Sequence, residues 1–148
     1  MTTARLVNIG DLDALLALFA ESDVSRSAEP ERARIIWAQI LACEGVMIFV
    51  SDESSRIVST CTLITAPNLL RGGRQHGALE NVATHPDFQG RGHGRAVVTA
   101  ALAEAWKQDC HQVLMQSGRA DPRVHRFYEA CGFVPGLRTA YAARRPAE

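Results

Sequence analysis

The chain has 148 residues, of which 47% are hydrophobic and 22% charged, a composition typical of one soluble globular domain. Sixteen basic residues balance sixteen acidic ones and only 6% are aromatic, so the overall charge gives no case for a nucleic-acid or membrane partner. No run approaches the ~20 apolar residues of a membrane-spanning helix, and no secretory signal is apparent, so we expect a cytoplasmic location.

The N-terminal part predicts a short strand followed by two helices. Arg5–Ile9 fits the strand, and Asp11 offers an N-cap oxygen for a helix whose apolar residues recur at helical spacing. A polar loop follows, and Pro30 suits the first turn of a second helix that ends before Gly45.

The middle of the chain predicts an antiparallel hairpin and a further strand. Residues 46–51 form a continuous apolar run, residues 52–55 are turn-like, and residues 57–65 are rich in β-branched side chains. Residues 78–84 fit another strand, which Pro86 closes.

The C-terminal part predicts two more helices with short strands between and after them. Helical spacing returns over 92–108, a short strand fits 113–116, and Asp121-Pro122 begins a helix that ends before Gly132. Val134 and residues 139–143 are candidates for closing strands. We therefore expect one α+β domain over residues 1–148, with a mixed sheet and helices packed on it.

The most informative segment is the strand 80–84 with the glycine-rich turn 89–94 and the helix after it. A helix N-terminus has unpaired N–H groups and a partial positive charge, and glycines allow an anion to approach the backbone closely. The segment therefore predicts a phosphate site. Tight-turn glycines are the simpler alternative. A Walker loop is excluded because no Lys-Ser/Thr pair follows Gly94.

Two motifs in this chain resemble the GCN5-related N-acetyltransferase (GNAT) superfamily. Gln89-x-x-Gly92-x-Gly94 matches its Gln/Arg-x-x-Gly-x-Gly/Ala signature, and Phe127-Tyr128-Glu129-x-x-Gly132-Phe133 is similar to its C-terminal helix-to-strand segment. The expected element order also fits that of the family, β-α-α-β-β-β-α-β-α-β-β, with splayed central strands.

The resemblance implies acetyl-CoA as co-substrate and two sets of residues that hold it. Backbone groups of one set pair with the pantetheine arm: Val82, Ala83 and Thr84. Backbone amides of the other surround the pyrophosphate: Gln89, Gly90, Arg91, Gly92, His93, Gly94 and Arg95. Asp121 stands where family members often carry a cofactor-binding Asn; capping of the next helix is the competing role for it.

The resemblance also implies direct transfer to an amine, with Tyr128 as the general acid that protonates the thiolate. Glu80 is the candidate general base; water and three histidines are its rivals. Those histidines are His76, His85 and His125. The alternatives are a core tyrosine and an ordinary strand glutamate paired with a cation such as Arg74.

The acceptor is expected to be a small-molecule amine, with a protein amine as the alternative. The resemblance places its pocket among residues 22–29, 68–77 and 136–144. A non-catalytic acyl-CoA sensor and a nucleotide-binding domain are the rival functions, and a homodimer is compatible with the family. The four scattered cysteines form no CxxC pair and predict free thiols without a metal site: Cys43, Cys61, Cys110 and Cys131.

Overall fold

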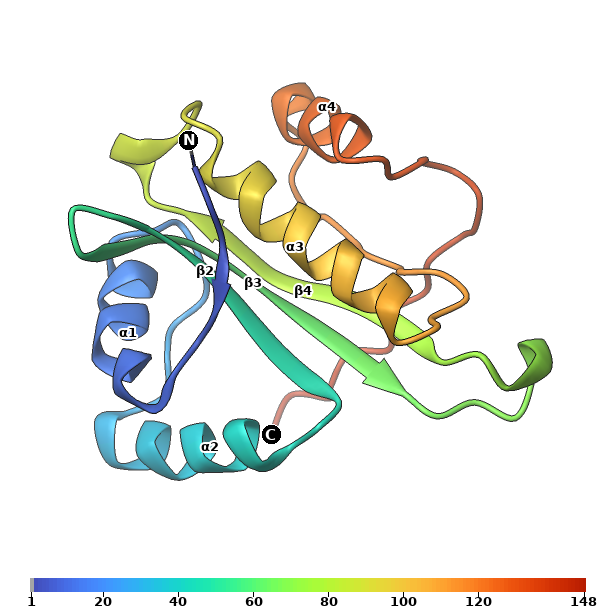
Figure 1. Ribbon diagram of the computed structural model, residues 1–148, viewed down its shortest axis with the longest axis horizontal. Coiled ribbons are helices and arrows are strands. Elements are labelled where there is room, and N and C mark those ends of the chain that lie inside the picture. The colour runs from blue at the N-terminus through green and yellow to red at the C-terminus, as the bar shows by residue number, and fades with distance from the viewer. Residues whose placement is uncertain (1) are drawn as a thin grey trace. The chain divides into compact units, whose positions relative to one another are not determined.

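The computed structural model describes residues 2–148 and divides the chain into two compact units, which meet between Met115 and Gln116. The first unit holds a four-stranded antiparallel sheet with the order β1-β2-β3-β4 and three of the α-helices (Figure 1). The second unit, Gln116–Glu148, holds α4. In the described part of the chain, no helix is both long and apolar enough to cross a membrane.

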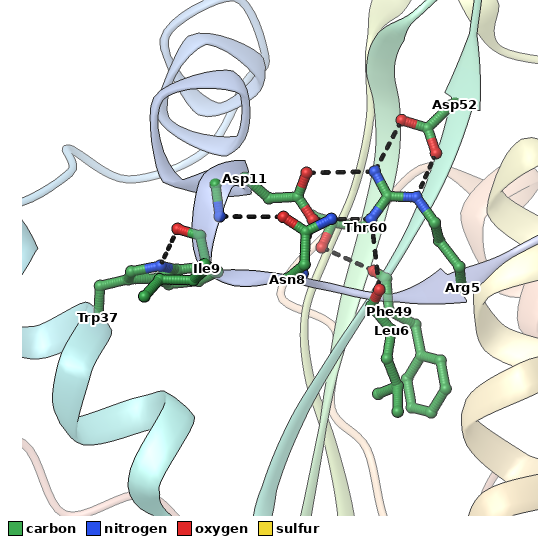
Figure 2. A network of polar contacts seen from close by, with 10 residues as sticks. Arg5, Leu6, Asn8, Ile9, Asp11, Trp37, Phe49, Asp52 and Thr60 are labelled. Atoms are coloured by element: carbon green, nitrogen blue, oxygen red, sulfur yellow. Dashed lines mark hydrogen bonds and ion pairs between the residues drawn. The ribbon is translucent and has the colours of Figure 1, made fainter.

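A network of polar contacts shapes the N-terminal segment (Figure 2). After β1 (Arg5–Leu6), Asn8 caps the 3-10 helix η1 (Ile9–Asp11), and the Asp11 side chain accepts a hydrogen bond from the Asn8 backbone N–H at 2.7 Å. Asp11 therefore closes a capping box from its third position. The prediction that its side chain caps α1 (Leu12–Ala20) directly is wrong, because that oxygen serves Asn8 and Arg5 instead.

Helix α2 (Pro30–Ala42) begins at the predicted proline and packs on the same face of the sheet as α1. Its Trp37 is 6% exposed and belongs to a buried cluster with Leu15 and Ile48. The Trp37 indole N–H donates to the Ile9 carbonyl at 3.1 Å (Figure 2). This bond fastens α2 to the segment that precedes α1.

The hairpin is confirmed as β2 (Val46–Glu53) and β3 (Arg56–Ala66), which pair antiparallel. Two residues connect the final pair, and both have positive φ: 52° at Ser54 and 62° at Ser55. Left-handed backbone at both central positions is what a two-residue hairpin turn of type I′ requires.

Strand β4 (His76–Thr84) pairs with β3 but contains an irregularity near its middle. Ala83 lies opposite Thr60 and Glu80 opposite Thr62, so two residues of β4 oppose one of β3. Asn81 has a φ of 52°, which an asparagine tolerates better than most residues. This is a β-bulge, which places Asn81 on a different face from the one that regular alternation would give it.

The short strand expected at 113–116 is present only as isolated parallel bridges beside β4. Cys110 bridges to Gln75 and Leu114 to Ala78. Gly77 permits this close pairing, since a Cβ there would lie 2.7 Å from the Gln112 carbonyl oxygen. The parallel partner thus accompanies only the first half of β4, as expected for strands that separate further along.

Helix α3 (His93–Lys107) covers the opposite face of the sheet from α1 and α2 (Figure 1). Alternation along β3 explains this arrangement: buried Cys61 donates from its thiol to the Val97 carbonyl of α3 at 3.3 Å, whereas its neighbour Thr62 points to the other side. Of the five apolar residues predicted for one face of α3, Leu102 is half-buried and the other four are buried: Val97, Val98, Ala101 and Ala105.

In the second unit, α4 (Pro122–Ala130) begins after Asp121, as predicted. The two closing strands are not formed: among the described residues 131–148 none is in a strand. Val134 is 64% exposed and Tyr141 89%. These apolar side chains therefore gain little burial that could stabilise strand pairing.

Candidate functional site

The N-terminus of α3 has the geometry of an anion site. Gly92 is its N-cap in the left-handed region at φ 91°, and Gly90 has φ 76°. The helical ladder begins with the bond from the Ala96 N–H to the Gly92 carbonyl at 2.9 Å. The amides before Ala96 therefore point out of the helix end, where an anion can accept from them.

The turn between β4 and this loop is braced by the side chains of Gln89 and His85. Gln89 donates through Nε2 to the Thr84 carbonyl at 3.4 Å. His85 is 7% exposed; its Nδ1 accepts from the Asp87 N–H at 3.1 Å, so its Nε2 donates to Glu21 at 2.7 Å. The contacts of His85 are structural and leave no nitrogen over for a base.

His93 does not present its side chain to the loop surface. It is 4% exposed, and its Nδ1 lies 2.8 Å from the Ser51 hydroxyl, which donates to the Thr3 carbonyl at 2.7 Å. Nε2 lies 2.6 Å from a Glu53 carboxylate oxygen, and His93 holds the pKa of Glu53 below its usual value.

The first residue of α3 is therefore tied to β2 through a buried imidazole and the Glu53 carboxylate. Arg91 shares the same carboxylate, with its guanidinium 3.2 Å from the other Glu53 oxygen, and lies 5.0 Å from the centre of the Phe88 ring. Arg56 approaches that ring at 5.6 Å. Arg91 is thus partly neutralised, while Arg95 lies exposed in the first turn of α3.

Of the predicted pantetheine-binding residues, Val82 belongs to the bulge in β4, and Ala83 and Thr84 follow it. Ala83 is 6% exposed, and Val82 and Thr84 are half-buried. The Ser59 hydroxyl contacts the Thr84 hydroxyl at 2.8 Å and donates to the Ala83 carbonyl at 3.1 Å. These bonds to β3 fix the end of β4 that leads into the loop.

Glu80 is exposed rather than partly buried. It lies opposite Thr62, and directly opposed residues of an antiparallel pair project from the same face. Arg74 forms its ion pair with Asp109 at 3.3 Å, so the alternative in which Arg74 holds Glu80 has no support. His76 stacks edge-on to His111 at 6.0 Å.

In the second unit, Asp121 accepts a hydrogen bond from the Arg123 N–H at 2.9 Å and forms an ion pair with the Arg123 guanidinium. The capping role predicted for Asp121 is confirmed. Tyr128 is half-buried, with its ring 5.0 Å from that of Phe127 and 6.0 Å from that of Phe133. His125 contacts the Arg119 carbonyl at 2.8 Å.

A cavity of about 430 Å³ lies between the sheet, α1 and α2. Residues 24–28 of the loop between the helices line it. They belong to one of the three segments expected around an acceptor, and that role stays a prediction. Trp37, Phe19 and Asn81 line it as well. None of these three residues was predicted to line a ligand site. Asn81 reaches the cavity because of the β-bulge. The one local signal for this bulge is the asparagine itself, next to Glu80.

Cys61 is not suited to act as a catalytic nucleophile. It is fully buried, and burial raises the pKa of its thiol to about 12, so the thiolate that a nucleophile needs is strongly disfavoured. Cys110 is also buried, and desolvation raises its pKa. Both are free thiols, as expected.

The fold of this chain is similar to that of solved acetyltransferase structures. A putative acetyltransferase from Agrobacterium tumefaciens str. C58 superposes with a TM-score of 0.88 at 38% identity, covering 97% of this chain and 99% of that one. The sequence pattern of the Acetyltransferase (GNAT) family matches residues 12–133. The chain therefore belongs to this family.

Curated relatives match over shorter stretches. A glucosamine 6-phosphate N-acetyltransferase from Trypanosoma brucei brucei is 30% identical over 86 residues, 58% of this chain and 56% of that protein. A probable glucosamine 6-phosphate N-acetyltransferase 2 from Oryza sativa subsp. japonica is 34% identical over 97 residues, 64% of this chain and 57% of that protein. The matched stretches span little more than half the length of these relatives.

Proposed function

We propose that the protein transfers the acetyl group of acetyl-CoA to the primary amine of a small molecule, by direct attack within a ternary complex. The observation that carries the proposal is the α3 N-terminus, where left-handed Gly92 leaves outward-pointing amides and buried His93 fixes the first helical residue through its contacts with Ser51 and Glu53. Such a site suits the pyrophosphate of the donor. Membership of the family supports acetyl-CoA as that donor.

The donor would lie along the second half of β4 and end at the loop. Backbone groups of Val82, Ala83 and Thr84 would pair with the pantetheine amides in the manner of an added strand. The amides of residues 89–95 would hold the pyrophosphate. The bonds from Ser59 to Ala83 and Thr84 hold this part of β4 in place before the donor arrives, which lowers the entropic cost of binding.

In the reaction, the amine nitrogen attacks the thioester carbonyl carbon, a C–N bond forms and the C–S bond breaks. One proton must leave the ammonium before attack, and Glu80 is the proposed base, directly or through water. The departing CoA thiolate takes a proton from the Tyr128 hydroxyl, and the second proton that the nitrogen loses after attack restores the phenol. Orientation of the two substrates supplies much of the rate, so the protein needs no acyl-enzyme intermediate.

Calorimetry and a thiol-release assay test the proposal together. We expect acetyl-CoA to bind while ATP and NAD do not, and we expect CoA thiol to appear when a suitable amine is added. Binding of acetyl-CoA without thiol release from any amine or protein acceptor would favour a non-catalytic sensor. Preference for ATP or NAD would contradict the donor site itself.

Glu80→Gln tests the base. An amide cannot accept the proton, so the variant depends on the fraction of acceptor already present as free amine, and that fraction shrinks as the pH falls. We expect the rate to drop most at low pH and to approach the wild-type rate at high pH. Glu44→Gln, another exposed glutamate, is the control. A loss that is equal at every pH would instead indicate substrate positioning.

A further inference from the structure

The cavity between the sheet, α1 and α2 is chemically distinctive. All but five of the side chains that line it are apolar; the five are Ser25, Arg26, Ser27, Thr62 and Asn81. Its volume of about 430 Å³ falls in the range of small-molecule sites, which are mostly apolar with few polar groups that fix orientation.

The charge of the cavity does not suit a phosphorylated or polyhydroxylated ligand. In the described chain, Arg26 is the one charged residue among those lining it. Its guanidinium lies 2.6 Å from Glu29, and its side chain is 87% exposed. A phosphate normally requires several converging cationic or N–H donors, and this rim offers a single arginine already paired with a carboxylate.

The apolar wall is rigidly held. The Trp37 indole is hydrogen-bonded to the Ile9 carbonyl, and Leu15 and Ile48 belong to the same buried cluster as Trp37. The capping box and the bonds from Arg5 to Asp11 fix the start of α1 (Figure 2). A preformed cavity avoids the cost of ordering its walls when a ligand enters.

The polar end of the cavity lies at the β4 bulge. The bulge brings Asn81 to the cavity wall, and Glu80 projects from the same face of the sheet because it pairs with Thr62, another lining residue. A ligand whose body fills the apolar part would thus present a polar group towards Asn81 and Glu80. Apolar surroundings also favour the neutral amine, the form that attacks.

We propose that the acceptor is a primary amine carried on an apolar aryl or alkyl body, which fills this cavity and directs the amine towards Asn81 and Glu80. The proposal rests on the acetyl transfer proposed above and names the acceptor class for it. It separates this chain from relatives named for glucosamine 6-phosphate.

A binding experiment tests the cavity independently of catalysis. The chain has two tryptophans, of which Trp37 lines the cavity and Trp106 is 54% exposed on α3. In a Trp106→Phe protein, Trp37 is the only indole fluorophore. We expect 2-phenylethylamine to change its emission saturably, and we expect ethanolamine and glucosamine 6-phosphate to leave it unchanged. No change with 2-phenylethylamine would overturn the proposal.

Kinetics test the same cavity in the working enzyme. From n-propylamine to n-hexylamine, we expect kcat/KM to rise about fourfold for each methylene buried. Ile36→Asn places an amide in the cavity wall, and we expect it to lower kcat/KM for 2-phenylethylamine about tenfold. Ile35→Asn is the matched control, because Ile35 is 63% exposed and does not line the cavity; its effect should stay within about twofold.

The outcomes distinguish the two proposals. If acetyl-CoA fails to bind while 2-phenylethylamine still alters Trp37 emission, the acetyl-transfer proposal fails and the apolar ligand site stands. If acetyl-CoA binds and glucosamine 6-phosphate or ethanolamine is the better acceptor, the acceptor class is wrong and acetyl transfer stands. Ile36→Asn could instead change the preference of the enzyme between hexanoyl-CoA and acetyl-CoA and leave its preference among amines unchanged. That result would assign the cavity to the acyl chain of the donor and overturn the proposal.

Discussion

Through its two ring nitrogens, His93 joins the β2–β3 hairpin to the end of the loop between β4 and α3. Nδ1 hydrogen-bonds to the Ser51 hydroxyl, and Nε2 contacts the Glu53 carboxylate near the hairpin turn. Because Ser51 is fully buried, the loss of either bond would leave a polar group without water to replace its partner. The position of the first residue of α3 therefore depends on two residues of β2.

Ser51→Ala should lower the free energy of unfolding by about 1–3 kcal/mol, because the buried His93 Nδ1 then loses its hydrogen-bond partner Ser51. Urea denaturation measures the change. A double-mutant cycle with His93→Phe provides the control, since the cost of Ser51→Ala should shrink once the imidazole is gone. Equal costs in both backgrounds would mean that the bond from Ser51 to the Thr3 carbonyl matters and the bond to His93 does not.

Tyr128 combines a half-buried ring, packed between Phe127 and Phe133, with a hydroxyl that a phenylalanine lacks. Tyr128→Phe keeps the ring and removes the proposed proton donor. We expect turnover to fall by about 10²-fold or more, with nearly unchanged acetyl-CoA affinity by calorimetry. Wild-type turnover would remove the acid role; equal losses of turnover and affinity would indicate a role in holding the donor.

Among the structural elements, the loop between β4 and α3 depends most on backbone conformation. Gly92 has a φ of 91°, and a Cβ at this position would meet no atom closer than the Thr2 hydroxyl at 3.6 Å. Other residues are therefore not excluded by a lack of space. They are excluded by the left-handed backbone conformation, which costs an L-residue about 1–2 kcal/mol and a β-branched residue more.

Gly92→Val should weaken acetyl-CoA binding by about tenfold or more, because relief of the strained φ turns the first amides of α3 away from a common point. Gly118→Val is the control: Gly118 is exposed, does not have positive φ, and has open space around its Cβ position. Calorimetry compares the two. Unchanged affinity in Gly92→Val would contradict the assignment of the loop to the donor.

The elements that depend on local signals were predictable from sequence. Asp121-Pro122 marks the start of α4, and the apolar spacing after Gly92 marks α3, because caps and periodicity act within a few residues. The bulge at Asn81 and the burial of His93 were not predictable. Each depends on partners far along the chain. The bulge depends on the pairing of β4 with β3 around Cys61, and the burial of His93 depends on Ser51 and Glu53 in β2. The two closing strands expected in the exposed C-terminal segment were predicted from apolar residues alone, and the described structure gives them no partner strand.

At the scale of the whole molecule, stability at acidic pH depends on the pair formed by Arg5 and Asp11 (Figure 2). Asp11 is 8% exposed and lies 2.7 Å from the Arg5 guanidinium. The hydrogen bond from Arg5 is the main cause that holds the pKa of Asp11 below its usual value. A depressed folded-state pKa stabilises the protein above the unfolded-state value of about 3.9, and this stabilisation is lost as the pH falls through the folded-state value.

Asp11→Asn should therefore destabilise the protein at pH 7 and matter progressively less as the pH falls below about 4, where the wild-type carboxyl also becomes neutral. Urea denaturation of both proteins across this range measures the difference. Asp13→Asn, on the exposed side of α1, is the control. A difference between Asp11→Asn and wild type that is constant with pH would show that shape, and not charge, is what Asp11 contributes.

The cavity has a genetic consequence. Every residue that lines it lies between Leu12 and Asn81, whereas the proposed pyrophosphate loop begins at Gln89. One continuous stretch of coding sequence thus specifies the walls of the apolar chamber, and the next stretch specifies the anion-binding turn. Recombination between these stretches could exchange one chamber for another while the turn is inherited intact, so acceptor preference and donor recognition could diversify at different rates.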